Sequence, residues 1–212
     1  MKKDKKKPSS GTSKKGISRR GFIRGAGLTT AGTVVLNSGV LAFEHKESYA
    51  QGDLLGEEAV EIMLKVNGRA QKLSVEPRTT LADALRDHLN MTGTKVVCDR
   101  GSCSACTVFL DGKPINSCMT LALDVGDQEV TTIEGISSDD KLHPVQEAFI
   151  EHDATQCGYC TPGMVMSCVH LLKHNSSPSL DDVKHATRGN LCRCGTYPHV
   201  FKATLSAAEK MK

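Results

Sequence analysis

The sequence predicts an α+β protein in which a domain of strands and one helix, residues 59–136, precedes an all-α domain, residues 142–212. Strand patterns and two hairpin signals fill the first region. After residue 142 only helical patterns remain. Eight of the nine cysteines fall into two sets of four, one in each region. A chain of 212 residues has room for two small domains of this kind.

The first domain begins with two predicted strands. The stretch VEIMLKVNGRAQKLSVEP contains Asn67-Gly68, a strong hairpin signal. TTLADALRDHL then predicts a helix capped by Thr80, with leucines at helical spacing. TVFLDGKPI predicts a second hairpin at Asp111-Gly112, and QEVTTIEGI predicts a final strand. Strands around one helix indicate a small α+β domain.

Four helical segments make up the second domain. They are HPVQEAFIEHD, TPGMVMSCVHLLKHN, SLDDVKHATRG and HVFKATLSAAEKMK. Pro144 and Pro162 stand at the start of the first two segments, where proline favours a helix. Ser179 and Asp182 predict a capping box at the start of the third, which ends at Gly189. Four helices in succession indicate a small bundle.

The positive charge of the chain belongs to its leader. Residues 1–24 carry a net charge of +9, whereas residues 51–212 carry −5. Since no basic patch remains beyond the leader, we expect no nucleic-acid partner.

The leader has the organisation of an export signal. After the basic region come Arg19 and Arg20, then Phe22 and an uncharged, weakly apolar stretch over residues 25–43. This resembles a twin-arginine (Tat) signal, which exports proteins that are already folded. The Tat route suits a protein whose cofactor is inserted in the cytoplasm.

We expect cleavage after Ala50, which makes residues 1–50 the signal peptide and residues 51–58 a linker. The mature protein would then be periplasmic, without a membrane span. A disordered basic tail and an uncleaved anchor are the alternatives, because the 19 uncharged residues lie within the roughly 17–25 that a span needs.

The cysteines of the first domain are spaced C-x4-C-x2-C-x11-C. Three ligands on one loop and a distant fourth match the plant-type ferredoxin pattern, which binds an iron–sulfur cluster. Gly101 and the small residues of CDRGSCSAC let backbone N–H groups point at the sulfurs. Zinc and disulfides are less favoured, since zinc sites more often contain two C-x2-C pairs or histidines. The predicted ligands are Cys98, Cys103, Cys106 and Cys118.

The second set is spaced C-x2-C-x31-C-x-C. Cys157 and Cys160 stand just before a predicted helix, and Cys192 and Cys194 stand just after one. A helix N-terminus favours thiolates and an anionic cluster. Taken alone, this set fits a four-thiolate zinc site equally well, but beside a ferredoxin loop it predicts a second iron–sulfur cluster. Cys168 is left over in an apolar helix, where we expect it to pack as a small hydrophobe.

From about residue 60 onward the chain resembles the small iron–sulfur subunit of the xanthine oxidase family, the molybdenum hydroxylases. GTKVVCDRGSCSACTVFLDGKPINSC, HPVQEAFIEHDATQCGYCTPGMVMS and GNLCRCGTY carry the resemblance in order, spacing and context. It implies a β-grasp ferredoxin-like domain followed by a four-helix bundle, with two [2Fe–2S] clusters. It also implies a large partner subunit carrying the molybdopterin cofactor, with Gln156 contacting the pterin and Cys194 near it.

The resemblance implies an electron-transfer subunit. Electrons would pass from molybdopterin to the second cluster, then to the first, then to FAD on another subunit or to a c-type cytochrome. Together with the leader, the pattern is similar to the small subunits of periplasmic aldehyde oxidoreductases. The alternatives are an isoquinoline-type oxidoreductase subunit, a free-standing ferredoxin carrier, and a scaffold with two zinc sites.

Two residues depart from the family pattern. Ser104 stands where glycine is usual, so this position lacks the freedom of glycine to adopt positive φ. His199 stands where arginine is common, which puts a surface or interface contact in doubt.

Overall fold

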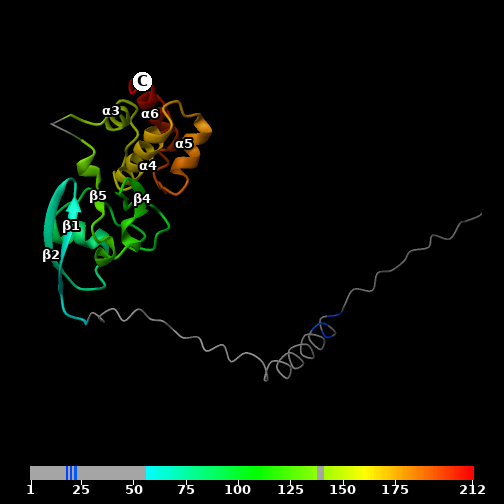
Figure 1. Cartoon of the computed structure of the whole chain (residues 1–212). Coiled ribbons are helices and arrows are strands. Elements are labelled where there is room, and N and C mark those ends of the chain that lie inside the picture. The colour runs from blue at the N-terminus through cyan, green and yellow to red at the C-terminus, as the bar shows by residue number, and fades with distance from the viewer. Residues whose placement is uncertain (1–17, 19, 21, 23–55, 138–140) are drawn as a thin grey trace, which may run out of the picture. The chain divides into compact units, whose positions relative to one another are not determined.

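The computed structural model describes Ser18, Arg20, Phe22 and residues 56–137 and 141–212. The chain divides into two compact units, Met1–Asp53 and Leu54–Lys212, and both predicted domains belong to the second unit (Figure 1). Of the first unit, the N–H of Phe22 donates to the carbonyl of Ser18 over 2.9 Å, as in a helix. The rest of the predicted Tat signal and its cleavage site lie outside the described residues.

A five-stranded sheet forms the first half of the second unit, in the order β2-β1-β5-β3-β4. β1 and β5 pair in parallel, and the other neighbours pair antiparallel. The strands are β1 (Val60–Val66), β2 (Arg69–Val75), β3 (Thr107–Leu110), β4 (Lys113–Asn116) and β5 (Glu129–Thr131).

Both predicted hairpins are confirmed. Asn67 and Gly68 have φ of 51° and 74°, and Asp111 and Gly112 have φ of 47° and 77°. Positive φ at both central residues is the mark of the type I′ turn, whose twist suits a two-residue hairpin. The Asp111 carboxylate also accepts from the N–H of Glu129 over 2.9 Å, which joins this turn to β5.

Two elements of this domain differ from the prediction. The predicted helix is a single α-turn, α2 (Leu81–Asp83), which continues as a π-helix, η1 (Ala84–His88). Thr80 caps it as predicted, accepting from the N–H of Asp83. Leu81, Ala84 and Leu85 are fully buried, so the wider turn keeps them in the core.

The predicted final strand is much shorter than expected. Only Glu129–Thr131 is extended, and Ile133–Gly135 forms the 3-10 helix η4. The ladder ends because the N–H of Thr132 donates to the side chain of Asn67 over 2.9 Å instead of to a strand. The apolar segment after β4 forms two more 3-10 helices, η2 (Ser117–Met119) and η3 (Ala122–Val125).

The four predicted helices are present. The last begins at Tyr197, two residues before the predicted start, with Pro198 in its first turn. The helices are α3 (Pro144–Glu151), α4 (Thr161–His174), α5 (Leu180–Thr187) and α6 (Tyr197–Lys210). Within the described residues, no helix has the length and apolarity needed to cross a membrane.

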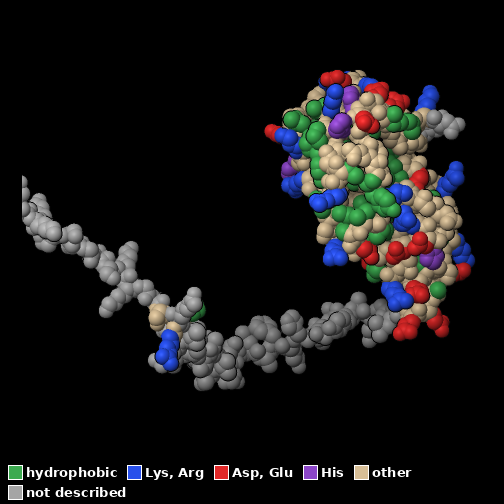
Figure 2. Space-filling model, turned by 180° about the vertical axis from the view of Figure 1, so that it is seen from behind, with side chains coloured by type: hydrophobic (Ala, Val, Ile, Leu, Met, Phe, Trp, Pro, Cys, Tyr) green, Lys and Arg blue, Asp and Glu red, His purple; other side chains and the backbone are tan. Residues whose placement is uncertain are grey.

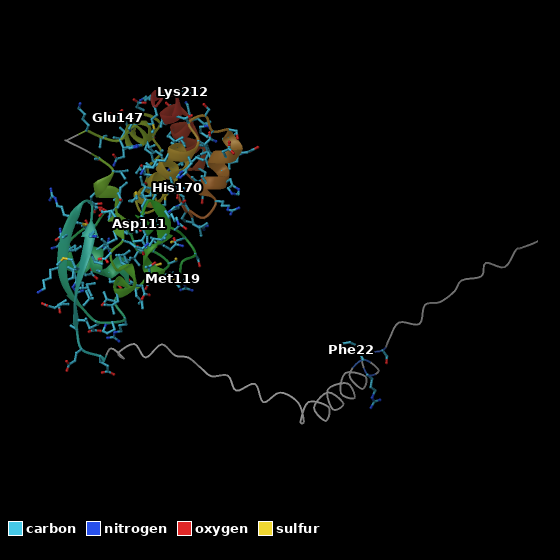
Figure 3. All side chains as sticks on the ribbon, in the orientation of Figure 1. Phe22, Asp111, Met119, Glu147, His170 and Lys212 are labelled. Atoms are coloured by element: carbon cyan, nitrogen blue, oxygen red, sulfur yellow. The ribbon has the colours of Figure 1, made fainter. Side chains whose placement is uncertain are left out.

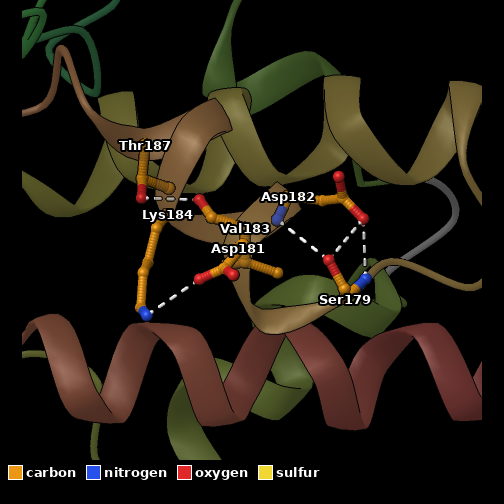
Figure 4. Close-up of polar contacts among 6 residues, drawn as sticks. All are labelled: Ser179, Asp181, Asp182, Val183, Lys184 and Thr187. Atoms are coloured by element: carbon orange, nitrogen blue, oxygen red, sulfur yellow. Dashed lines mark hydrogen bonds and ion pairs between the residues drawn. The ribbon is translucent and has the colours of Figure 1, made fainter.

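The capping box predicted for α5 is confirmed (Figure 4). The hydroxyl of Ser179 accepts from the N–H of Asp182 over 3.2 Å, and the Asp182 carboxylate accepts from the N–H of Ser179 over 2.8 Å. At the other end, the Thr187 hydroxyl donates to the carbonyl of Val183 over 2.8 Å. Both ends of this short helix are therefore fixed, and the loop that follows it starts from a defined position.

The sheet and the helices meet through Phe109, which extends from β3 into the helical core. Its ring lies 6.0 Å from that of His170 on α4, and the Lys173 ammonium lies 5.2 Å from its centroid. His170 and Asp111 both lie at this junction (Figure 3). Phe109 is 1% exposed, so the two halves share buried apolar surface.

The surface carries charges of both signs. On the face drawn in Figure 2, Lys and Arg side chains are interspersed with Asp and Glu, and hydrophobic side chains are visible between them.

Candidate metal centre

The first set of cysteines lies on the loop between η1 and β3 and on η2. Cys98 is half-buried, whereas the other three are buried. The loop turns sharply because Asp99, Gly101 and Ser104 have positive φ, between 51° and 70°. Inside this turn, the N–H of Ser102 donates to the sulfur of Cys98 over 3.3 Å. The loop thus presents backbone donors to a thiolate, as the small residues predicted.

The thiols of this set interact with one another. The pKa of Cys98 is lowered to about 7, chiefly by hydrogen bonding from the Arg100 backbone. Burial raises this pKa, whereas hydrogen bonds from the Cys103 thiol and the Ser102 backbone lower it. Burial, with smaller contributions from the thiol of Cys106 and the charge of Cys98, raises the pKa of Cys118 to about 11. All four sulfurs therefore belong to one group.

The second set lies at the ends of three helices. Cys157 and Cys160 directly precede α4, and Cys192 and Cys194 lie between α5 and α6. Cys157 is exposed and the other three are half-buried. Burial, with a smaller contribution from the thiols of Cys192 and Cys157, raises the pKa of Cys160 to about 12. Cys194 interacts with Cys157 and Cys192 in turn. Two cysteine pairs separated by 31 intervening residues thus form one group of thiols.

Cys192 is surrounded by hydrogen-bond donors. Burial raises the pKa of Cys192, but hydrogen bonds to its sulfur lower that pKa. The Thr196 hydroxyl lies 3.2 Å from the sulfur, and the backbones of Thr196 and Gly195 and the Cys160 thiol also contribute. The net result is a pKa of about 7. The N–H of Cys192 donates to the Tyr197 hydroxyl over 2.8 Å, which fixes the loop on α6.

Both groups contain the residues that an iron–sulfur cluster requires. Each donor set is four thiols, the usual ligand set of a [2Fe–2S] cluster. All nine cysteines are free, so the structure offers no disulfide.

Cysteines of both groups line one hollow of about 560 Å³, namely Cys98 and Cys103 of the first and Cys157, Cys160 and Cys192 of the second. Its mouth is apolar, since Val97, Tyr159 and Leu191 are 57%, 60% and 56% exposed. Inside it, the N–H of Leu191 donates to the carbonyl of Cys103 over 3.0 Å. The loops of the two groups are therefore in direct contact.

Comparison with known proteins agrees with this geometry. A 2Fe-2S iron-sulfur cluster binding domain matches residues 64–131, and a [2Fe-2S] binding domain matches residues 132–205. The iron-sulfur-binding subunit PaoA of an aldehyde oxidoreductase from Escherichia coli (strain K12) is 40% identical over 211 residues, covering 92% of this chain and 90% of PaoA.

The chain belongs to the small iron–sulfur subunits of the molybdenum hydroxylases. The nicotine 6-hydroxylase small subunit of Paenarthrobacter nicotinovorans is 46% identical, over 70% of this chain and 89% of that subunit. The crystal structure of quinoline 2-oxidoreductase from Pseudomonas putida 86 has a TM-score of 0.69 at 41% identity, covering 72% of this chain and 95% of the matched chain.

This molybdenum hydroxylase subunit consists of a β-grasp ferredoxin-like domain and a helical [2Fe–2S]-binding domain, as predicted. Its family transfers electrons, and the catalytic centre is on another subunit. A large molybdopterin-binding partner is implied by the multi-subunit enzymes to which its homologues belong.

The two departures from the family pattern have clear structural positions. Ser104 adopts a positive φ of 51° although it is not glycine. His199 directs Nδ1 at the carbonyl of His152, 2.9 Å away, so it joins α6 to the end of α3. His152 lies four residues before Gln156 in the chain. Gln156 and its neighbour Cys157 are both exposed.

Sequence reasoning missed the residues that support the cysteines in this subunit. Thr196 and Tyr197 bond to Cys192, and the buried Asn190 bonds to the carbonyl of Ser104 over 3.0 Å. Their nearness to Cys192 in the sequence was the available signal. Cys168 is buried, as expected, and accepts from the Thr204 hydroxyl over 3.1 Å.

Proposed function

We propose that this chain carries electrons from the molybdopterin of a large partner subunit through two [2Fe–2S] clusters to an acceptor. The observation that carries the proposal is the pair of four-thiol groups joined by the Leu191–Cys103 hydrogen bond. The first cluster is assigned to Cys98, Cys103, Cys106 and Cys118, and the second to Cys157, Cys160, Cys192 and Cys194.

When bound, each cluster would supply one-electron redox chemistry. The chain holds the sulfurs, limits access of water and aims hydrogen-bond donors at the thiolates. Donors such as the Ser102 N–H and the Thr196 hydroxyl stabilise negative charge on sulfur and so influence the reduction potential. The two sites differ in burial, because three cysteines of the first set are buried and none of the second is.

Electrons enter, in this proposal, at the second site. Gln156 is exposed directly beside Cys157, which alone of the eight cysteines is exposed, so a partner can reach both. We assign Gln156 to a contact with the pterin. From the first site electrons would leave to FAD on another subunit or to a c-type cytochrome.

An aldehyde is the proposed substrate class of the whole enzyme. The aldehyde oxidoreductase subunit PaoA supports this proposal, because its alignment covers 92% of this chain. The alignment therefore extends beyond the two domains, residues 59–136 and 142–212. An N-heteroaromatic substrate is the second candidate, because the matched nicotine and quinoline enzymes are 46% and 41% identical to this chain.

Export through the Tat pathway to the periplasm completes the proposal. Its support is the Arg19-Arg20 pair, the uncharged stretch after it, and the extension of the PaoA alignment into this leader. A cofactor-containing complex must be folded before it crosses the membrane by this route.

Purification of the tagged chain from its own cell tests the proposal. We expect a molybdopterin-containing large subunit to co-purify, with iron and two distinct rhombic EPR signals after reduction by dithionite. A chain that purifies alone with its clusters intact would be a ferredoxin carrier. Zinc without iron would overturn the redox function altogether.

A further inference from the structure

Asn190 lies between the two cysteine loops, and no part of the proposed function uses it. We infer that Asn190 is a positioning residue that fixes the second cysteine loop against the first and thereby sets the rate of electron transfer between the two clusters. The inference rests on the proposed function for the identity of the clusters. Its structural half, the fixing of one loop by the other, stands on hydrogen bonds alone.

All polar groups of Asn190 are engaged although the residue is only 2% exposed. Its side-chain N–H donates to the Ser104 carbonyl over 3.0 Å, and its side-chain oxygen accepts from the Ser167 hydroxyl over 2.8 Å. Its backbone N–H donates to Thr187 over 2.9 Å, and its carbonyl accepts from the Tyr197 hydroxyl over 3.1 Å. A buried amide whose nitrogen and oxygen both have hydrogen-bond partners has one defined orientation.

The acceptor, Ser104, is held equally firmly. Its carbonyl also accepts from the Thr107 hydroxyl over 2.8 Å. A Cβ at Gly163, in the first turn of α4, would clash with this carbonyl, so glycine allows the helix to approach it. A Cβ at Gly189 would lie 3.2 Å from the Ser104 hydroxyl. The Ser104 peptide is thus enclosed by its own loop, by α4 and by the loop after α5.

The contact continues along both loops. Asn190 bonds to Ser104, and the next residue, Leu191, bonds to Cys103 over 3.0 Å. Cys103 belongs to the first thiol group, and Cys192 directly follows Leu191 in the second. Any shift at Asn190 therefore moves a ligand of one site relative to a ligand of the other. Electron tunnelling falls steeply with distance, so loss of this contact slows transfer when it lets the two loops separate.

Asn190→Asp in the complete complex is the test. Aspartate keeps the acceptor for Ser167 but places an oxygen, instead of an N–H donor, against the Ser104 carbonyl. We expect both clusters to keep their individual EPR signals. After rapid mixing with benzaldehyde, the second-site cluster should reduce at the unaltered rate and the first-site cluster about 10–100-fold more slowly. The Leu191 amide should exchange with deuterium faster than in the unaltered complex.

Asn67→Asp is the matched control. Asn67 also bridges two segments with its amide, donating to the Thr132 hydroxyl over 3.0 Å, but it lies within the sheet domain. It should change neither the transfer between clusters nor the exchange of Leu191. Ser167→Ala is the second variant if Asn190→Asp fails to assemble, because it removes only the bond that orients the amide. Ser167→Ala should slow reduction of the first-site cluster and speed exchange of the Leu191 amide, both to a smaller extent than Asn190→Asp.

Unaltered transfer between clusters and unaltered Leu191 exchange in Asn190→Asp or Ser167→Ala would overturn the inference. Absence of two [2Fe–2S] signals, or no reduction by benzaldehyde, in the unaltered complex would contradict the proposed function instead. In that case the exchange of the Leu191 amide still decides whether Asn190 fixes the loops.

Discussion

The backbone N–H of Leu191 donates to the carbonyl oxygen of Cys103 over 3.0 Å. One residue adjoins a cysteine of the helical domain, and the other is a cysteine of the ferredoxin-like domain. Because the bond is between backbone groups, side-chain substitution at Leu191 leaves it in place unless the new residue is proline. The two candidate cluster sites are therefore joined by a feature that most sequence changes preserve.

Ser104→Gly should stabilise the chain. Serine at φ 51° is in the left-handed region, which costs a non-glycine residue about 1–2 kcal/mol, while glycine loses more entropy on folding. We expect a net gain of up to ~1 kcal/mol in the free energy of unfolding, measured by thermal unfolding of the cluster-loaded subunit. Ser104→Ala keeps the strained φ and should give no gain. A gain with alanine would attribute the effect to the hydroxyl instead.

Gly163→Ala should separate α4 from the first cysteine loop. The new Cβ would meet the backbone of Ser104 and Ala105, which has little room to move. We expect a loss of ~1–3 kcal/mol in the free energy of unfolding, the usual cost of overpacking. Gly189→Ala is the control, because it would approach only the movable Ser104 hydroxyl at 3.2 Å. Equal losses in both variants would contradict this account of the contact.

Gln156→Ala should leave both clusters in place. The side chain is exposed, so its removal creates no cavity and leaves the thiol groups intact. We expect unchanged iron content and EPR signals, with slower electron entry or weaker binding of the large subunit. The exposed Gln128→Ala, in the sheet domain, is the control. Unchanged turnover and assembly would count against the pterin contact.

Acidification should weaken the junction at His170. Burial lowers its pKa from 6.5, and the nearby charge of His174 and Lys173 lowers it further, with the Gly112 backbone opposing. A histidine with a depressed pKa binds fewer protons folded than unfolded, so stability falls as the pH drops through 6.5 toward the folded value. Carboxyls with a lowered pKa, such as Asp111, lose their contribution only below about pH 4.

His170→Phe should reduce this loss of stability between pH 7 and pH 5. Phenylalanine keeps a ring beside Phe109 and removes a buried nitrogen, Nδ1, that has no hydrogen-bond partner. The melting temperature of the variant should change less over this range than that of the unaltered chain. The exposed His88→Gln serves as control. An identical pH profile in His170→Phe would assign the effect to other groups, of which His143 is the first candidate because burial lowers its pKa too.

Replacement of Arg19 and Arg20 by lysine should hold the complex in the cytoplasm. This double replacement keeps the positive charge of the leader, so only recognition of the arginine pair is lost. The measurement is the distribution of the chain between cytoplasmic and periplasmic fractions. Lys14 and Lys15 replaced by arginine provide the control, with export unchanged. Full periplasmic recovery of the twin-lysine variant would contradict the Tat assignment.

Features that depend on neighbouring residues could be predicted from the sequence. The Asn67-Gly68 and Asp111-Gly112 turns and the Ser179 cap are local, because the residues that form them also determine their backbone angles. The grouping of the cysteines was readable as spacing, although their role as ligands stays a prediction. Local patterns failed where a distant partner intervened, as when the Asn67 side chain ended β5 at Thr132.

The sequence by itself determined the order of the ferredoxin-like and helical regions and the grouping of eight cysteines into two sets. Only the tertiary structure decided how the two thiol groups meet. Asn190 and Ser104 are 86 positions apart, and neither has a local partner that predicts the other. Their contact depends on the approach of α4 at Gly163 and on the burial of Phe109 between the domains. The contact between Asn190 and Ser104 is fixed by the packing of segments that are distant in the sequence, and no periodicity or residue spacing predicts it.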